Sequence, residues 1–191
     1  MNQENKKTRA LITGHTKGIG NAIQEVLQAH GIECVGFSRS NGFDVLEKED
    51  HIVEQAKEFD WVILNAYAGR SQTQMLEKLV QNYKNHNKKI VVITSTSGLD
   101  HCLDDNITDP FYIEYIKNKK ELIRFIANIQ QDLLFDRLSV YDICPDIVDT
   151  DMTKGLWTPF PRLRPRDVAE SVRSVLTQEQ YNINQLVLQK K

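Results

Sequence analysis

The sequence is poor in cysteine, and its few cysteines follow no functional spacing. Cys34, Cys102 and Cys144 are odd in number and far apart, so they have neither the density of a disulfide scaffold nor the paired spacing of a zinc site. The five histidines are scattered in the same way, without the spacing of metal ligands. We therefore expect no bound metal and a reduced, cytoplasmic setting.

Strong net charge and long hydrophobic runs are also lacking. The formal net charge of −2 gives no long-range field that would attract nucleic acid or an anionic membrane. Residues 1–9 lack the apolar centre of a signal peptide, and no later stretch approaches the length needed to span a bilayer. We therefore expect neither nucleic acid nor a membrane among the partners.

Short apolar runs alternate with segments of helical periodicity along the chain. Six runs are rich in β-branched residues and too short for helices, at residues 9–13, 32–38, 61–65, 90–95, 138–144 and 185–188. Apolar residues recur at three- and four-residue intervals at residues 19–29, 50–58, 73–86, 112–135 and 167–176. This alternation is typical of βαβ units. It predicts one α/β domain over residues 1–191, a doubly wound parallel sheet with helices on both faces.

A glycine-rich turn follows the first predicted strand. The sequence Thr13-Gly14-His15-Thr16-Lys17-Gly18-Ile19-Gly20 lies between an apolar run and a helical segment. Such a turn exposes backbone N–H groups and lets a pyrophosphate approach the main chain, beside the positive end of the helix dipole. The turn predicts a dinucleotide site, although tight strand-to-helix turns also use glycine for steric reasons alone.

Three polar residues could carry acid–base chemistry. Tyr115 and Lys119 lie four residues apart in a helical segment, so they project from the same face. An ammonium near a phenol lowers the phenol pKa, which suits Tyr115 to proton transfer. Ser95 follows a buried run, at the strand end where α/β proteins bind ligands, and its hydroxyl could hold a substrate oxygen. Each residue also has a non-functional interpretation. The spacing of Tyr115 and Lys119 could arise by chance, and Ser95 could be a solvated loop residue.

Taken in order along the chain, these motifs resemble the short-chain dehydrogenase/reductase family. Thr13-Gly14-x-x-x-Gly18-Ile19-Gly20 resembles its cofactor turn, Asp44-Val45 the pair after its third strand, and Asn65-Ala66 part of its Asn-Asn-Ala-Gly motif. Ser95, Tyr115 and Lys119 fall where the family has its catalytic residues, and Pro145-Asp146-Ile147-Val148-x-Thr150 resembles its Pro-Gly-x-x-x-Thr segment. The resemblance implies a Rossmann-type fold with strand order 3-2-1-4-5-6-7. It also implies hydride transfer between a nicotinamide cofactor and a small carbonyl or alcohol substrate.

The resemblance assigns a role to each matched residue. Tyr115 would exchange a proton with the substrate oxygen and Ser95 would hold that oxygen. Lys119 would lower the pKa of Tyr115 and bind the nicotinamide ribose. The residues expected to contact the cofactor are Gly14, Thr16, Lys17, Gly18, Ile19, Arg39, Asp44, Asn65, Ala66, Tyr115, Lys119, Pro145, Ile147, Val148 and Thr150.

Two basic residues favour NADP over NAD. Arg39 follows the second predicted strand, near the place where an acidic residue would bind an unmodified ribose, and residues 37–41 include no Asp or Glu. The resemblance implies that a basic residue at Lys17 helps to hold a 2′-phosphate. Guanidinium binds phosphate in a bidentate manner and lysine adds a point charge. We expect NADP, with two solvated surface cations as the alternative interpretation.

The chain departs from the family pattern in three places. The interval between Asn65 and Ser95 is short, which predicts a trimmed helix, and no residue in it convincingly matches the family's proton-relay asparagine. Asp146 replaces the usual glycine after Pro145, where glycine permits dihedrals that other residues avoid. These departures favour an alternative function, a weakly catalytic or non-catalytic NADP(H)-binding regulator or interaction module.

The substrate and the assembly are less constrained by the sequence. Loops at residues 99–112 and 150–166 would frame a substrate, but neither carries a motif that identifies a chemical group. The C-terminal end is short, so we do not expect a tetramer through it. A homodimer through the helix at residues 112–135 is the assembly that the sequence leaves open.

Overall fold

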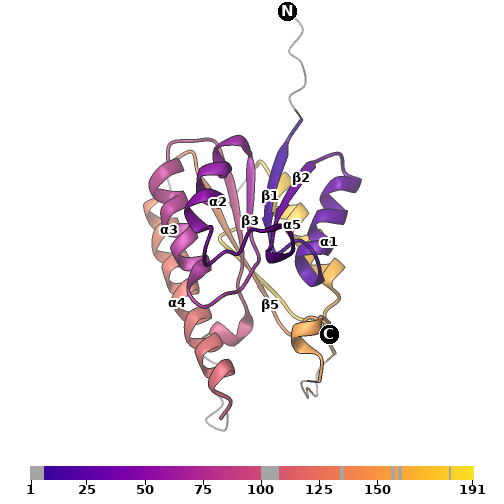
Figure 1. The fold of residues 1–191 in the computed structure, drawn as a ribbon. Helices are drawn as coiled ribbons and strands as arrows, with labels where there is room; N and C mark the ends of the chain where they lie inside the picture. Colours follow the sequence, from indigo (N-terminus) through magenta and orange to yellow (C-terminus); the bar gives the residue numbers. More distant parts are fainter. Residues whose placement is uncertain (1–6, 100–107, 134–135, 156–157, 159–160, 181) are drawn as a thin grey trace, which may run out of the picture.

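One sheet of parallel strands runs through the centre of the molecule (Figure 1). The computed structural model describes residues 7–99, 108–133, 136–155, 158, 161–180 and 182–191. Within these residues, six strands lie in the order β2-β1-β3-β4-β5-β6, and every neighbouring pair is parallel. They are β1 (Arg9–Thr13), β2 (Glu33–Phe37), β3 (Trp61–Leu64), β4 (Lys89–Ile93), β5 (Ser139–Pro145) and β6 (Gln185–Leu188). Each of the six predicted runs forms a strand.

Helices cover both faces of this sheet (Figure 1). On one face α1 (Gly18–Ala29) packs against α5 (Pro165–Thr177), and the other face carries α2 (Glu49–Gln55), α3 (Ser71–Tyr83) and α4 (Pro110–Asp132). Short 3-10 helices join these elements, at η1 (Arg39–Asn41), η2 (Ala56–Glu58), η3 (Thr96–Gly98) and η4 (Asp151–Thr153). The predicted doubly wound α/β fold is confirmed.

Each face of the sheet has its own hydrophobic core. Successive residues of a strand point to opposite faces, and β4 shows this directly. Ile90 and Val92 pack with residues of α3 and α4, whereas Val91 and Ile93 pack with residues of α1 and α5. All four side chains are buried. Helices exclude water from both faces, which explains why this run is apolar at every position.

The strand order differs from the predicted 3-2-1-4-5-6-7. Residues 38–60 contain η1, α2 and η2 but no strand, so β2 forms the edge of the sheet. The apolar residues of this connection fill the core instead. Phe43 packs edge-on against Phe37, with ring centroids 4.7 Å apart, and Val45 is buried in the same cluster as α2. The chain passes from β2 through η1 to α2, and the strand expected outside β2 is missing.

The missing strand also changes two expectations about neighbouring motifs. The pair Asp44 and Val45 follows η1, so it does not follow a third strand as the resemblance implied. The interval between Asn65 and Ser95, where we expected a trimmed helix, holds the 13-residue helix α3. The element that is missing relative to the expected order is therefore the strand between β2 and β3, and the helix between Asn65 and Ser95 is present.

The described part of the chain has neither a membrane-spanning helix nor a cluster of metal ligands. No helix in it is long and apolar enough to cross a membrane. In the same residues, no group of three or more His, Cys, Asp or Glu side chains is arranged to hold a metal ion.

Candidate active site

The predicted glycine turn joins the carboxyl ends of β1 and β3. The Thr13 hydroxyl oxygen accepts hydrogen bonds from the backbone N–H groups of Asn65, at 3.0 Å, and Ala66, at 3.1 Å. The Asn65 side-chain amide donates in return to the carbonyl oxygens of Thr13, at 3.1 Å, and Gly14, at 3.2 Å. These four bonds bring two motifs that are far apart in the sequence into one site.

The turn needs glycine, and its residues Thr16 and Lys17 are exposed. Gly14 and Gly18 have φ angles of +72° and +57°, which other residues rarely adopt. A Cβ on Gly20 would lie 2.2 Å from the Gly14 carbonyl oxygen and 2.6 Å from Nδ2 of Asn65. Lys17 is the N-cap of α1 and makes no side-chain capping bond. An uncapped helix end behind a glycine turn fits the pyrophosphate of a dinucleotide.

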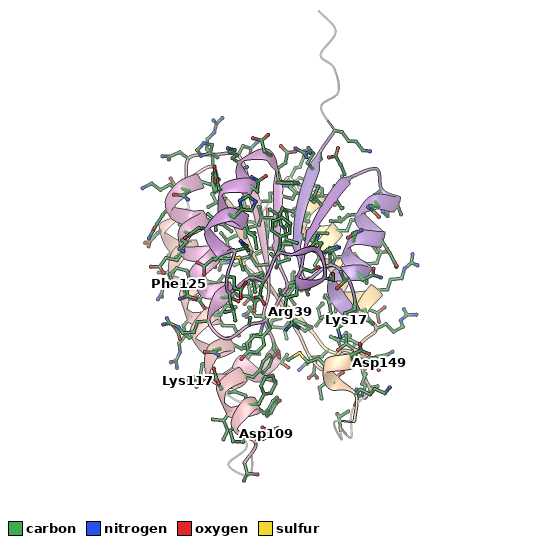
Figure 2. The ribbon with its side chains drawn as sticks, in the orientation of Figure 1. Lys17, Arg39, Asp109, Lys117, Phe125 and Asp149 are labelled. Atoms are coloured by element: carbon green, nitrogen blue, oxygen red, sulfur yellow. The ribbon has the colours of Figure 1, made fainter. Side chains whose placement is uncertain are left out.

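Both basic residues predicted to bind the cofactor lie at this end of the sheet, as Figure 2 shows. Arg39 is exposed and is the first residue of η1, directly after β2. Nζ of Lys17 pairs with Oδ2 of Asp151 in η4 at 3.1 Å, and the two side chains are 73% and 71% exposed. An exposed ion pair of this kind contributes little free energy, so Lys17 can exchange Asp151 for a phosphate.

Three other predicted cofactor residues have different surroundings. Thr16 is exposed in the glycine turn, whereas Ile19 packs partly buried against the core of α1 and α5. Oδ1 of Asp44 accepts a hydrogen bond from the backbone N–H of Leu46 at 2.9 Å and so shapes the turn into α2. This contact gives Asp44 a structural role, and its role near the adenine stays a prediction.

The segment after β5 approaches the glycine turn. Pro145 ends β5, and Val148 is buried and forms a single β-bridge with Leu163. Thr150 reaches α1, because a Cβ on Gly18 would lie 3.3 Å from Cγ2 of Thr150. The structure therefore places the predicted capping segment beside the predicted cofactor turn.

Asp146 occupies its position in this segment without strain. No non-glycine residue of the described ranges has a positive φ, so the backbone at Asp146 does not require glycine. Its N–H donates to the Leu188 carbonyl oxygen at 2.9 Å, and its Oδ1 accepts from the Thr96 hydroxyl at 3.2 Å. The neighbouring Ile147 is half-buried, and its carbonyl accepts from the N–H of Leu163 at 2.9 Å. The departure from glycine is accommodated by these contacts.

Ser95, Tyr115 and Lys119 meet at the carboxyl end of β4. Ser95 precedes η3, where its side chain accepts a hydrogen bond from the N–H of Ser97 at 3.2 Å. Its side chain also lies near enough to the Tyr115 hydroxyl to act on the pKa of that residue. Nζ of Lys119 lies 5.6 Å from the centroid of the Tyr115 ring. The hydroxyl groups of Ser95 and Tyr115 and the amine of Lys119 therefore lie in one compact group.

Burial shifts the pKa of both titratable residues in this group. Burial raises the pKa of Tyr115 to about 12, although the nearby Ser95 side chain acts in the lowering direction. Lys119 is only 3% exposed, and burial lowers its pKa to about 7 against the opposing influence of Asp142 and Cys144. At neutral pH Tyr115 keeps its proton, and Lys119 lies between its charged and neutral forms.

Gln72, which the sequence motifs did not indicate, contacts Lys119 directly. Its Oε1 accepts a hydrogen bond from Nζ of Lys119 at 2.7 Å, and it is buried in the first turn of α3. One signal was available in the sequence. Gln72 stands three and four residues before the buried Met75 and Leu76, so it is a polar residue on the apolar face of an amphipathic helix.

An aromatic cluster flanks Tyr115. The Tyr67 ring meets the rings of Tyr115 and Phe111 edge-on, at centroid distances of 4.9 Å and 6.3 Å. Tyr112 stacks on Tyr115 at 6.0 Å, and its hydroxyl lies 3.0 Å from that of Ser97. Phe111 is 57% exposed. Residues 100–107, 156–157 and 159–160 of the two expected substrate loops lie outside the described residues. The cluster surrounds the Tyr115 ring with other aromatic rings.

The sequence matches no family model and no curated protein. Solved structures, however, match the fold over nearly the whole chain. An alcohol dehydrogenase from the archaeon Thermococcus sibiricus, complexed with 5-hydroxy-NADP, is 19% identical with a TM-score of 0.70, covering 96% of this chain and 97% of that chain. A short-chain dehydrogenase from Burkholderia cenocepacia, in complex with NADP, is 15% identical with a TM-score of 0.74, covering 96% and 89%. A short-chain dehydrogenase from Streptomyces avermitilis is 16% identical with a TM-score of 0.74, covering 96% and 89%.

Similarity at these identities concerns the arrangement of helices and strands. It covers 96% of this chain in each of these three comparisons. The chain therefore has the fold of short-chain dehydrogenases.

Proposed function

We propose that this protein is a member of the short-chain dehydrogenase/reductase family, an NADP(H)-dependent oxidoreductase that acts on a small carbonyl or alcohol substrate. One observation carries this proposal. Ser95, Tyr115 and Lys119 meet at the carboxyl edge of the same sheet whose glycine turn fits a dinucleotide. Ligands of open α/β sheets bind at this edge, so a substrate there would contact both groups of residues.

The proposed roles follow from the state of each group. Tyr115 keeps its proton at neutral pH, as a proton donor to a carbonyl oxygen must. The Ser95 side chain is near enough to the Tyr115 hydroxyl to influence its pKa, so both could contact the same substrate oxygen. Lys119 in its charged form favours the phenolate that remains after the proton has left. When bound, NADPH supplies the hydride.

The residues present also support the choice of NADP. Arg39 is exposed at the end of β2, and Lys17 is held only by an exposed ion pair with Asp151. Both can reach solvent at the edge of the site, where a 2′-phosphate would carry its charge. Solved structures of the same fold were obtained in complex with NADP, from Burkholderia cenocepacia, and with 5-hydroxy-NADP, from Thermococcus sibiricus.

Turnover of NADPH with a panel of aldehydes and ketones tests the proposal. We expect the wild type to oxidise NADPH with at least one compound, and Tyr115→Phe to lower kcat/KM by about a hundredfold or more, because the proton donor is lost. Tyr83→Phe is the matched control, since it removes only a buried hydroxyl that donates to the Val53 carbonyl at 3.0 Å. Equal turnover by Tyr115→Phe and the wild type would refute the role of Tyr115.

The alternative function is an NADP(H)-binding regulator or interaction module with little or no catalysis. The same experiment separates the two, because NADPH binding without turnover of any compound in the panel would favour the regulator. A homodimer through α4 is a further proposal, which light scattering of the purified protein would test.

A further inference from the structure

The Lys119 amine is held by oxygen atoms at the ends of two elements. Its Nζ donates to Oε1 of Gln72 at 2.7 Å and to the carbonyl oxygen of Ile93, the last residue of β4, at 2.8 Å. Both bonds are buried. A buried amine is costly unless hydrogen bonds replace its water, so these two acceptors decide where Nζ can lie and whether it can carry charge.

Gln72 is itself fixed by the strand ends. Its Nε2 donates to the carbonyl oxygens of Leu64, at 2.8 Å, and Ile93, at 3.1 Å, where β3 and β4 end. A flipped amide would turn its oxygen toward these carbonyls and its NH₂ group toward the Lys119 amine, so every bond would be lost. Only one orientation satisfies the network, and it aims Oε1 at Nζ.

We propose that Gln72 is a positioning residue that holds Nζ of Lys119 beneath the rings of Tyr67 and Tyr115 and stabilises its charged form. Nζ lies 5.6 Å from the centroid of each ring. The effect of Gln72 on Lys119 stands on the hydrogen bonds alone, whereas its consequence for proton transfer by Tyr115 rests on the proposed function.

An amide suits this place better than a carboxylate or an apolar side chain. A carboxylate would pair with the amine and press its second oxygen against the Leu64 and Ile93 carbonyls. An apolar residue would leave the amine with Ile93 as its acceptor and release both carbonyls from their donor. The other groups that influence the amine are Asp142 and Cys144 of β5, which the substitutions leave in place.

NMR titration of Lys119 in the full-length protein without ligand tests the proposal. A lysine side-chain signal assigned by its absence in Lys119→Met would be followed against pH in the wild type, Gln72→Met and Gln72→Glu. We expect Gln72→Met to lower the Lys119 pKa by about one pH unit or more, and Gln72→Glu to raise it by a similar amount. Gln74→Met, an exposed site on the same helix, is the control and should leave the titration unchanged.

The outcomes are decisive even if one variant does not fold. If Gln72→Met is unfolded, the raised pKa in Gln72→Glu supports the proposal and an unchanged pKa overturns it. Identical titration of Lys119 in all folded variants overturns it as well. Because this readout needs no turnover, failure of the proposed enzymatic function would leave the result on Gln72 intact.

A kinetic measurement then tests the consequence for catalysis. In the direction of carbonyl reduction, kcat/KM should fall as pH rises through the Lys119 pKa, because a neutral Lys119 no longer favours the phenolate that Tyr115 becomes. Gln72→Met should move that fall to lower pH by about one pH unit, because it lowers the Lys119 pKa. A pH profile that coincides with that of the wild type would show that Gln72 has no influence on Tyr115.

Discussion

Tyr115 and Lys119 share one face of α4, yet burial moves their pKa values in opposite directions, to about 12 and about 7. In both residues the neutral form is favoured, because a low-dielectric environment penalises charge of either sign. The Ser95 hydroxyl acts in the opposite direction on Tyr115, and Asp142 and Cys144 do so on Lys119. Burial thus keeps the Tyr115 phenol protonated at neutral pH, as its proposed role as a proton donor requires.

Lys119 should make the stability of the protein depend on pH. Its pKa is about 7 in the folded state against an ordinary value of 10.5, so between these values the unfolded chain holds a proton that the folded chain lacks. The free energy of unfolding should therefore rise with pH across this window, by up to about 1.4 kcal/mol per pH unit, and the contribution is lost as pH falls toward 7. Lys119→Met should lack this slope.

Urea unfolding of the wild type and Lys119→Met near neutral pH and in mildly alkaline buffer measures the difference. Other groups that titrate in the same range, such as Cys34, are present in both proteins and largely cancel. Parallel pH dependence in the two proteins would show that Lys119 is charged throughout and would contradict this account.

Arg39 should distinguish the two nicotinamide cofactors. Arg39→Asp should weaken NADPH binding by about tenfold or more, because a charge-assisted contact to the 2′-phosphate is replaced by repulsion, and should affect NADH less. Arg137→Asp is the matched control, since it makes the same charge change at an exposed site beside the start of β5, at the opposite edge of the sheet. Fluorescence titration of the three proteins with NADPH and with NADH gives six dissociation constants, and equal NADPH affinity in Arg39→Asp and the wild type would refute the role of Arg39.

At the scale of elements, local patterns predicted most of what the structure contains. The β-branched runs became strands because helices cover both faces of the sheet, and the periodic segments became helices because one face of each packs on the sheet. The helix boundaries differ from the predicted ones where a capping residue determines the first residue of the helix. Helix α4 begins at Pro110 because the Asp109 side chain accepts a hydrogen bond from the N–H of Phe111 at 2.9 Å, two residues before the periodic segment that we identified.

Gly20 belongs to the glycine turn, and the atoms packed around it leave no room for a Cβ. Gly20→Ala should destabilise the protein by about 1–3 kcal/mol, because its Cβ would overlap the Gly14 carbonyl oxygen and Nδ2 of Asn65. Asn21→Ala is the control on the next residue of α1, where the side chain makes only an exposed hydrogen bond to Glu25. Urea unfolding should show a loss within about 0.5 kcal/mol for this control. Equal stability of Gly20→Ala and the wild type would mean that the turn is looser than the structure shows.

Over the whole molecule, the order of the motifs predicted which strand ends converge, but it could not reveal the contacts made by closure of the fold. The glycine turn, Asn65, Ser95 and Thr150 lie at one edge because the carboxyl ends of parallel strands share that edge. The missing strand between β2 and β3 could not be read from motifs, because Asp44-Val45 looks the same after a 3-10 helix as after a strand. Gln72 was missed because its partners, Lys119 and Ile93, are remote in sequence.

The proposed function requires that this edge of the sheet binds NADP(H). Titration of the wild-type protein with NADPH and with NADH, followed by nicotinamide fluorescence, tests it directly. We predict saturable binding of one NADPH per chain with a lower dissociation constant than for NADH, because the glycine turn fits the pyrophosphate and Arg39 and Lys17 are placed for a 2′-phosphate. Absence of binding by either nucleotide would contradict the proposed dinucleotide site. Equal affinity for NADPH and NADH would contradict the proposed specificity for NADP.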